Sequence, residues 1–182
     1  MLQKVLSTID IYIDTVQTIK LPLDEYRVRL LESFVLKKRL SDNPKDYSYE
    51  DYVVPYFKSV NFLNDYIVDF FALDYEKDLL FQKHWGNIYL PMERSHTRNQ
   101  INPLDMGQSP DYTYIYGVDV APDSCELVLE YDDHRRKGNT WHIPLENNKF
   151  IIFPSTQKYF ISQNKSSAIN VFLTTNLEIA RQ

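Results

Sequence analysis

The sequence predicts a mainly β domain, a sandwich or jelly roll, preceded by a strand and two helices. The second half of the chain is a series of short runs rich in Val, Ile and aromatic residues, separated by turn-forming residues. The 14 tyrosines and 10 phenylalanines, with only 4 glycines, also favour a sheet-rich core. At about 150 residues per domain, the 182 residues fit one domain, with 1–77 supporting a core over 78–182.

The N-terminal part begins with a predicted strand. Ile9, Ile11 and Ile13 alternate with other residues at the period of two that strands require.

The first helix is predicted over Glu25–Leu40, with Asp24 as its N-cap. Its apolar stripe consists of Val28, Leu31, Val35 and Leu36. We expect this stripe to pack on one face of the sheet.

The second helix is predicted over Pro55–Leu73. Its apolar residues recur at helical spacing: Val60, Leu63, Ile67, Phe70 and Phe71. We expect them to pack on the same sheet as the first helix.

The core is predicted to consist of strands joined by short polar turns. The strands cover Leu79–Leu90, Tyr112–Val120, Cys125–Tyr131, Asn139–Ile143, Phe150–Phe153, Tyr159–Ile161 and Ala168–Thr175. The charged run Asp132–Gly138 is expected to be a hairpin turn. Between the first two strands, Ser95–Asp111 is long for a loop inside a compact domain, and such loops are often functional.

Two residues of this loop carry candidate chemistry. His96 follows a predicted strand and suits a metal ligand or general base, or it holds the loop by a hydrogen bond. Arg98 shares its face if the segment is extended. Its guanidinium suits a carboxylate or a phosphate, or a surface ion pair, and it would repel a divalent metal at His96.

Composition excludes several function classes. The net charge of −5 argues against nucleic acid as the main partner. The isolated glycines allow neither a dinucleotide-binding nor a Walker phosphate loop. No apolar run is long enough to span a bilayer, and the first residues lack a secretory pattern. Cys125, the only cysteine, is expected to be a small buried residue and fits a reducing, cytoplasmic compartment.

The C-terminal half, over Asp78–Asn176, resembles the double-stranded β-helix (cupin-like jelly roll) of the iron(II)/2-oxoglutarate-dependent oxygenases. It is most similar to the prolyl-hydroxylase-like branch that is frequent in bacteriophages. The resemblance rests on motifs that occur in the same order. They are Trp85-Gly-Asn-Ile-Tyr, Met92-Glu-Arg-Ser-His96, Tyr112-Thr-Tyr-Ile-Tyr116, Phe150-Ile-Ile-Phe-Pro-Ser155 and Asn170-Val-Phe-Leu-Thr-Thr-Asn176.

The resemblance also implies where a metal site would lie. The family binds iron through His-x-Asp and a distal His, and His96 matches the first histidine. Arg98 stands at the carboxylate position and Tyr159 at the distal histidine position. The arginine that would bind 2-oxoglutarate is replaced by Asn170. Asp105 or Glu93 is a substitute carboxylate ligand if an iron site is retained.

Three functions remain open at this stage. The first is a divergent oxygenase-like protein that lacks the usual iron site and binds a small polar or anionic ligand. Its pocket would be lined by Asn87, Tyr89, His96, Arg98, Tyr114, Tyr116, Tyr159 and Asn170. The alternative for these side chains is a filled barrel in which they satisfy one another.

The second function is an active hydroxylase that uses Fe(II), 2-oxoglutarate and substitute ligands. The third is a structural or interaction module, for instance a viral accessory protein acting in the host cytoplasm. This third hypothesis predicts an exposed apolar patch or a self-association interface.

Overall fold

The computed structural model describes part of the N-terminal region and nearly all of the core. The described residues are 9–16, 27–29, 32, 52–53, 58–75, 77–134 and 137–180.

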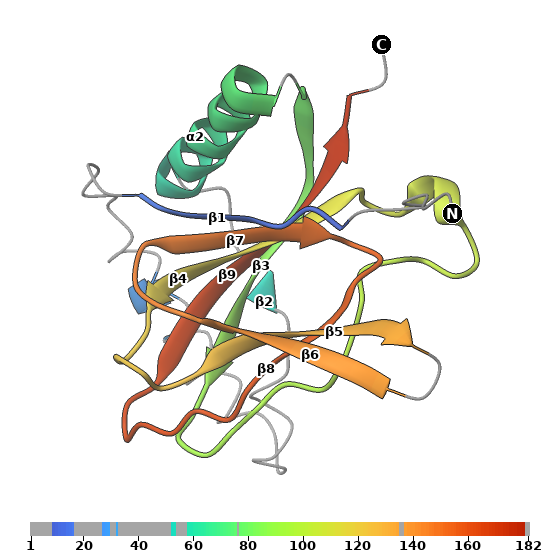
Figure 1. Ribbon diagram of the computed structural model, residues 1–182. Coiled ribbons are helices and arrows are strands. Elements are labelled where there is room, and N and C mark those ends of the chain that lie inside the picture. Colours follow the sequence, from blue (N-terminus) through green and yellow to red (C-terminus); the bar gives the residue numbers. More distant parts are fainter. Residues whose placement is uncertain are drawn as a thin grey trace.

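Two antiparallel sheets lie face to face, with one long helix on the outer side of the larger sheet (Figure 1). The larger sheet has the strand order β1-β7-β4-β9-β3-β2, and the smaller has the order β6-β5-β8. The strands are β1 Tyr12–Thr15, β2 Tyr52–Val53, β3 Leu79–Tyr89, β4 Tyr112–Asp119, β5 Glu126–His134, β6 Lys137–Pro144, β7 Lys149–Pro154, β8 Lys158–Ile161 and β9 Asn170–Ile179. The helices are α2, Lys58–Tyr75, and the short 3-10 helix η2, Met106–Gln108.

Every predicted strand of the core is present, within a few residues at each end. One difference is in the charged run Asp132–Gly138, where the predicted turn is too long. Asp132 pairs with Gly138 and His134 with Lys137, so the hairpin strands continue into this run.

The predicted loop over Ser95–Asp111 begins as a further edge of the small sheet. The Arg98 N–H donates to the Tyr159 carbonyl at 2.9 Å, and the Tyr159 N–H donates back to Arg98 at 2.8 Å. The Ser95 N–H donates to the Ile161 carbonyl at 3.1 Å. Residues 95–100 therefore lie beside β8, and the small sheet continues as β6-β5-β8-(95–100).

Helix α2 packs on the large sheet as the sequence predicts. Val60, Leu63, Ile67 and Phe71 are fully buried, and Phe70 packs at the margin of the same cluster. The helical spacing of these residues brings them to one side, which faces Tyr114, Tyr116, Phe150 and Ile152 of the sheet.

The first predicted helix falls mainly outside the described residues. Residues 27–29 and 32 are helical, while Leu31, Val35 and Leu36 lie outside the described residues. Val28, predicted for the buried stripe, is 52% exposed, so that prediction is wrong. Its helical neighbour Arg27 instead forms an ion pair with Asp119 at 2.6 Å, which ties this segment to the end of β4 by charge.

The space between the two sheets holds a second core. Ile115, Ile151, Phe153 and Phe172 of the large sheet pack against Leu127, Leu129, Tyr159 and Ile161 of the small one. Because side chains alternate along a strand, β3, β4, β7 and β9 each send one set to α2 and the other into this inner core. No helix among the described residues is long and apolar enough to cross a membrane.

Candidate functional site

The structure does not bring the eight predicted pocket residues together. Tyr114 and Tyr116 point toward α2 instead of the space between the sheets, so their assignment to the pocket is wrong. The Tyr114 hydroxyl donates to Asn64 of α2 at 2.6 Å, and the Tyr116 hydroxyl donates to Asn148 at 2.8 Å. Burial raises the pKa of both phenols above the usual value. Both therefore act as neutral donors in the helix-facing core.

Asn170 lies on the inner face of β9, but it serves as an anchor for the turn before β5. Its Oδ1 accepts the Ala121 N–H at 3.0 Å, and its Nδ2 donates to Ser124 Oγ at 2.8 Å. The same amide lies 3.3 Å from Cys125 Sγ. Asn170 has 0% exposure and its amide is fully engaged, so it closes this end of the barrel.

Asn87 and Tyr89 also lie on the inner face, and both are buried. The Asn87 Oδ1 accepts the Thr174 hydroxyl at 2.8 Å, across the pairing of β3 with β9. The Tyr89 ring packs against Phe172 at 5.7 Å between ring centroids. Asn87 and Tyr89 therefore make contacts within the chain on this face.

The positions assigned to metal ligands do meet in space. Arg98 and Tyr159 are bridge partners, so their side chains share one face of the small sheet. The guanidinium carbon of Arg98 lies 5.7 Å from the centroid of the Tyr159 ring, a cation–π geometry. The Tyr159 hydroxyl accepts the Gln100 side-chain amide at 2.8 Å. A guanidinium and a hydrogen-bonded phenol thus stand where the resemblance places carboxylate and imidazole ligands.

The remaining candidate ligands do not complete an iron site. His96 is exposed. Glu93 caps the turn after β3, since its Oε2 accepts the Leu90 N–H at 2.7 Å. Asp105 caps η2 by accepting the Gly107 N–H at 3.1 Å. The described residues contain no group of three His, Cys, Asp or Glu side chains that could hold a metal ion. The donor set here, dominated by Arg98, does not fit Fe(II) of the family type.

A buried polar row near Arg98 was missed by the sequence analysis. Thr113 Oγ1 lies 2.7 Å from Ser155 Oγ and donates to Asn176 Oδ1 at 3.1 Å. Trp85, on the inner face of β3, is 1% exposed, and its indole N–H has no hydrogen-bond partner within the described chain. In the sequence, the available signal for this row was the alternation of polar and apolar residues in β9. That alternation does not show which face of the strand points into the space between the sheets.

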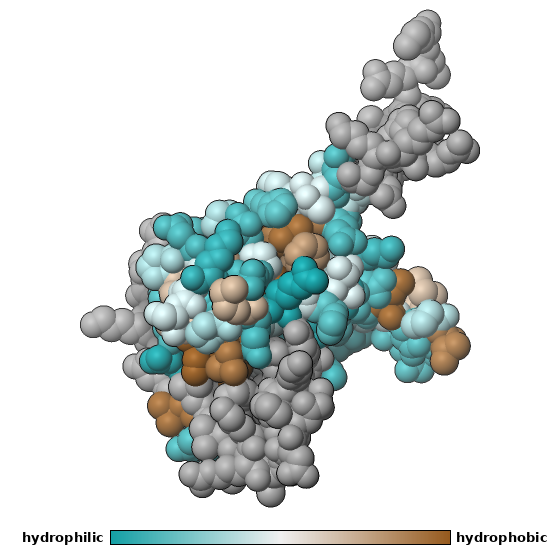
Figure 2. Space-filling model, turned by 90° about the horizontal axis from the view of Figure 1, so that it is seen from below, coloured by the Kyte–Doolittle hydropathy of each residue, from teal (hydrophilic) through white to brown (hydrophobic). Residues whose placement is uncertain are grey.

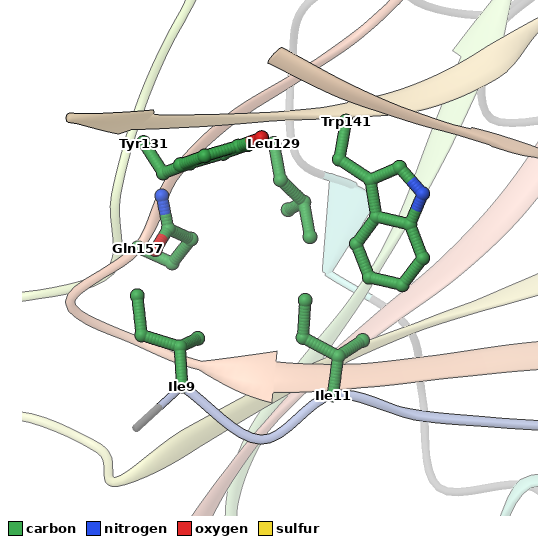
Figure 3. Close-up of a pocket in the computed structure, with 6 residues that line it drawn as sticks. All are labelled: Ile9, Ile11, Leu129, Tyr131, Trp141 and Gln157. Atoms are coloured by element: carbon green, nitrogen blue, oxygen red, sulfur yellow. The ribbon is translucent and has the colours of Figure 1, made fainter. Parts of the chain in front are cut away.

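An apolar cleft at the opposite side of the barrel was also missed. Figure 3 shows Ile9 and Ile11 beside β1 pointing toward Leu129, Tyr131 and Trp141 of the small sheet, with Gln157 at one end. The cleft has a volume of about 200 Å³. The residues that line it are partly exposed to solvent: the exposed fraction is 54% for Ile9 and 45% for Trp141. Residues so distant in sequence give no joint signal before the fold is known.

Comparisons with known proteins agree with the architecture. No protein-family model and no curated protein sequence matches the chain. A solved prolyl-4-hydroxylase from Pseudomonas putida is similar in structure, with a TM-score of 0.59, 12% identity, and 96% of this chain and 94% of that chain covered.

Two further solved structures show the same likeness. The α-ketoglutarate-dependent carbocyclase SnoK from nogalamycin biosynthesis has a TM-score of 0.62 at 9% identity, covering 92% of this chain and 78% of that one. The viral collagen prolyl hydroxylase of Paramecium bursaria Chlorella virus-1 has a TM-score of 0.56 at 11% identity, covering 94% of this chain and 90% of that one. The chain therefore has the double-stranded β-helix fold of the 2-oxoglutarate/Fe(II) oxygenases, as the sequence motifs predicted.

Proposed function

We propose that this protein is a divergent, oxygenase-like jelly roll that binds a small anionic ligand at the Arg98 end of its barrel. In this proposal it does not use the iron site of the fold. The observation that carries it is the buried Trp85 indole N–H, which has no acceptor within the described chain. A buried donor of this kind costs roughly 1–3 kcal/mol unless an acceptor satisfies it.

The path of the chain supports a site between Trp85 and Arg98. β3 ends at Tyr89, a tight turn follows, and residues 95–100 then run along the other sheet. Trp85 on β3 and Arg98 on the returning segment therefore belong to opposite sheets. An indole N–H and a guanidinium are both donors, and together they favour a carboxylate or a phosphate.

Asp111, before β4, and Glu178, near the end of β9, are hydrogen-bonded within the chain. Asp111 Oδ2 accepts the Ile179 N–H at 2.8 Å, and Glu178 accepts the Gln82 amide at 2.9 Å. The Arg98 backbone is held by two hydrogen bonds to Tyr159, and its guanidinium packs against the Tyr159 ring. Such preorganisation lowers the entropy lost on binding.

Tryptophan fluorescence tests the proposal directly. The protein has 2 tryptophans, so Trp141→Phe leaves Trp85 as the single reporter. This variant is titrated with 2-oxoglutarate, succinate and inorganic phosphate. We expect a saturable change with at least one of these anions. Arg98→Gln in the same background should weaken binding by about tenfold, the loss expected for one charge-assisted hydrogen bond.

Arg94→Gln is the matched control, because Arg94 is exposed in the preceding turn and its loss changes the net charge equally. It should leave the titration unchanged. No saturable signal at millimolar anion, or equal weakening by both variants, contradicts the proposal. A metal-to-2-oxoglutarate charge-transfer band after anaerobic addition of Fe(II), lost in His96→Ala, would instead support an active hydroxylase with substitute ligands.

A further inference from the structure

We propose that the free edge of β1, with the cleft beside it, binds an extended basic peptide segment of a partner protein. The segment would add a strand to the large sheet next to β1. This interaction surface is separate from the anion site at the Arg98 end and does not depend on it.

The edge of β1 that faces away from β7 has no strand partner among the described residues. Tyr12 pairs with Ile152 of β7, and the Val16 N–H donates to the Asn148 carbonyl in the same register at 2.9 Å. In an antiparallel ladder, hydrogen-bonded pairs recur at every second residue. The N–H groups of Tyr12 and Asp14 therefore face β7.

The alternate residues, Ile11, Ile13 and Thr15, direct their N–H groups away from β7. The Thr15 N–H is instead bound by its neighbour, with Asp14 Oδ1 as the acceptor at 2.7 Å. β1 is the terminal strand of its sheet within the described part of the chain. An edge of this kind is a template for a further strand.

The cleft of Figure 3 suits one row of the added strand's side chains. Its volume of about 200 Å³ is below the roughly 300–1,000 Å³ typical of small-molecule pockets. It therefore suits one apolar side chain rather than a whole ligand. Ile9 and Trp141 are both well exposed at its mouth, so such a side chain would complete their burial.

The side chains of the added strand that point to its other face would contact acidic and aromatic groups. A wider hollow of about 570 Å³ brings Asp10, Tyr12 and Tyr75 together with Trp141. The rings of Tyr12 and Tyr75 lie edge to face, with centroids 4.5 Å apart. The chain's own Lys77 ammonium sits 5.7 Å from the Tyr12 ring centroid, which shows that this cluster accepts a cation.

In the register centred on Tyr12, charge favours a basic partner segment over a second copy of this chain. The strand segment 10–14 reads Asp-Ile-Tyr-Ile-Asp. Two copies paired antiparallel about Tyr12 would place Asp10 opposite Asp14 twice, and like charges directly opposite are destabilising. A partner strand with alternating basic and apolar residues avoids this repulsion and complements both rows.

Figure 2 shows the molecule from below, and its coloured surface is mainly hydrophilic with separate apolar patches. The polar pairs His142–Glu126 at 2.9 Å and Thr97–Glu130 at 3.2 Å belong to the small sheet. The apolar and acidic features that favour a strand gather at β1.

The test uses the full chain and a fluorescent peptide that alternates arginine and isoleucine, followed by fluorescence anisotropy at low salt. A peptide that alternates glutamate and isoleucine is the charge control. Two further peptides carry backbone N-methyl groups on alternate residues, in opposite phases. In an edge-bound strand only one phase points its N–H groups at β1, so one N-methylated peptide should bind and the other should not.

Matched variants locate the site. The double variant Asp10→Asn and Asp14→Asn should weaken binding of the basic peptide by about tenfold, as expected for the loss of two partly exposed charges. Asp65→Asn with Asp69→Asn, on the exposed side of α2, makes the same charge change and should have no effect.

The apolar row is tested by Ile9→Ala, which should also weaken binding. Leu104→Ala serves as its control, because Leu104 is 95% exposed in the loop before η2.

Three results would overturn the proposal. They are equal binding of the acidic peptide, equal binding of both N-methylated phases, and equal effects of the two double Asp variants. Concentration-dependent dimerisation that Asp10→Asn with Asp14→Asn strengthens, in the absence of peptide binding, would assign the edge to a second copy. Circular dichroism of each variant separates loss of binding from loss of fold.

Discussion

Asn170 provides the sharpest test of how the fold uses a position that the resemblance assigns to cofactor binding. The geometry predicts a structural role, because the amide holds the Ala121 N–H and the Ser124 hydroxyl in a fully buried turn. In Asn170→Ala the Ala121 N–H loses its acceptor, which costs about 1–3 kcal/mol. Loss of the bond to Ser124 adds about 1 kcal/mol. We expect the free energy of unfolding to fall by about 3 kcal/mol.

Urea denaturation measures this change. With a slope of about 2 kcal/mol per molar urea, a loss of 3 kcal/mol lowers the midpoint by roughly 1.5 M. The slope itself should stay constant, because the native state remains compact. Asn99→Ala is the control, since Asn99 is half-buried and its side chain makes no hydrogen bond within the described chain.

Two results would refute the reasoning. A midpoint shift for Asn170→Ala no larger than that of Asn99→Ala would show that the three contacts contribute nothing. An unchanged urea midpoint together with loss of anion binding would indicate that Asn170 belongs to the ligand site. Asn170→Asp adds a second check, because a carboxylate can accept from Ala121 but cannot donate to Ser124. It also places a charge in a buried site, so its stability should recover as the pH falls.

Three other predictions follow from buried groups. Gly117→Ala should lower stability by about 3 kcal/mol or more, because a Cβ there would lie 2.0 Å from the Glu146 carbonyl oxygen; an unchanged melting temperature would contradict this. Burial raises the pKa of the Tyr116 phenol, so the native state holds this proton more tightly than the unfolded state. Stability should fall as the pH rises above 10, the usual tyrosine value, and urea titrations on either side of that pH should show a smaller fall for Tyr116→Phe. Burial also raises the pKa of the Cys125 thiol, so a thiol reagent at neutral pH should react much faster in urea than with the native protein.

Local pattern alone was enough for the elements. The alternation in the core strands and the stripe of α2 depend on steric periods that each segment carries in its own sequence. The ordered motifs led to the double-stranded β-helix for the same reason, because each motif marks one strand or one turn. The charged hairpin after Tyr131 was predicted less accurately, since its strands continue into the run expected to be a turn.

The pocket could not be predicted in the same way. A period of two separates the two faces of β4, but it does not say that Tyr114 faces a helix and Ile115 faces the other sheet. Nor does the sequence show that Asn170 reaches Ala121, because strand pairing sets that contact across 49 residues. Arg98 and Tyr159 meet only because residues 95–100 join the edge of β8.

The sequence by itself determined where strands and the long helix form, which residues alternate along them, and which fold their order resembles. Only the tertiary structure decided which face of each strand lines the barrel, that Asn170 is tied to a turn, and that Ile9 meets Trp141 at a cleft. The physical reason is that secondary structure follows from local sterics and side-chain periodicity. The sites depend on pairing between distant strands, and the burial of the whole molecule selects that pairing.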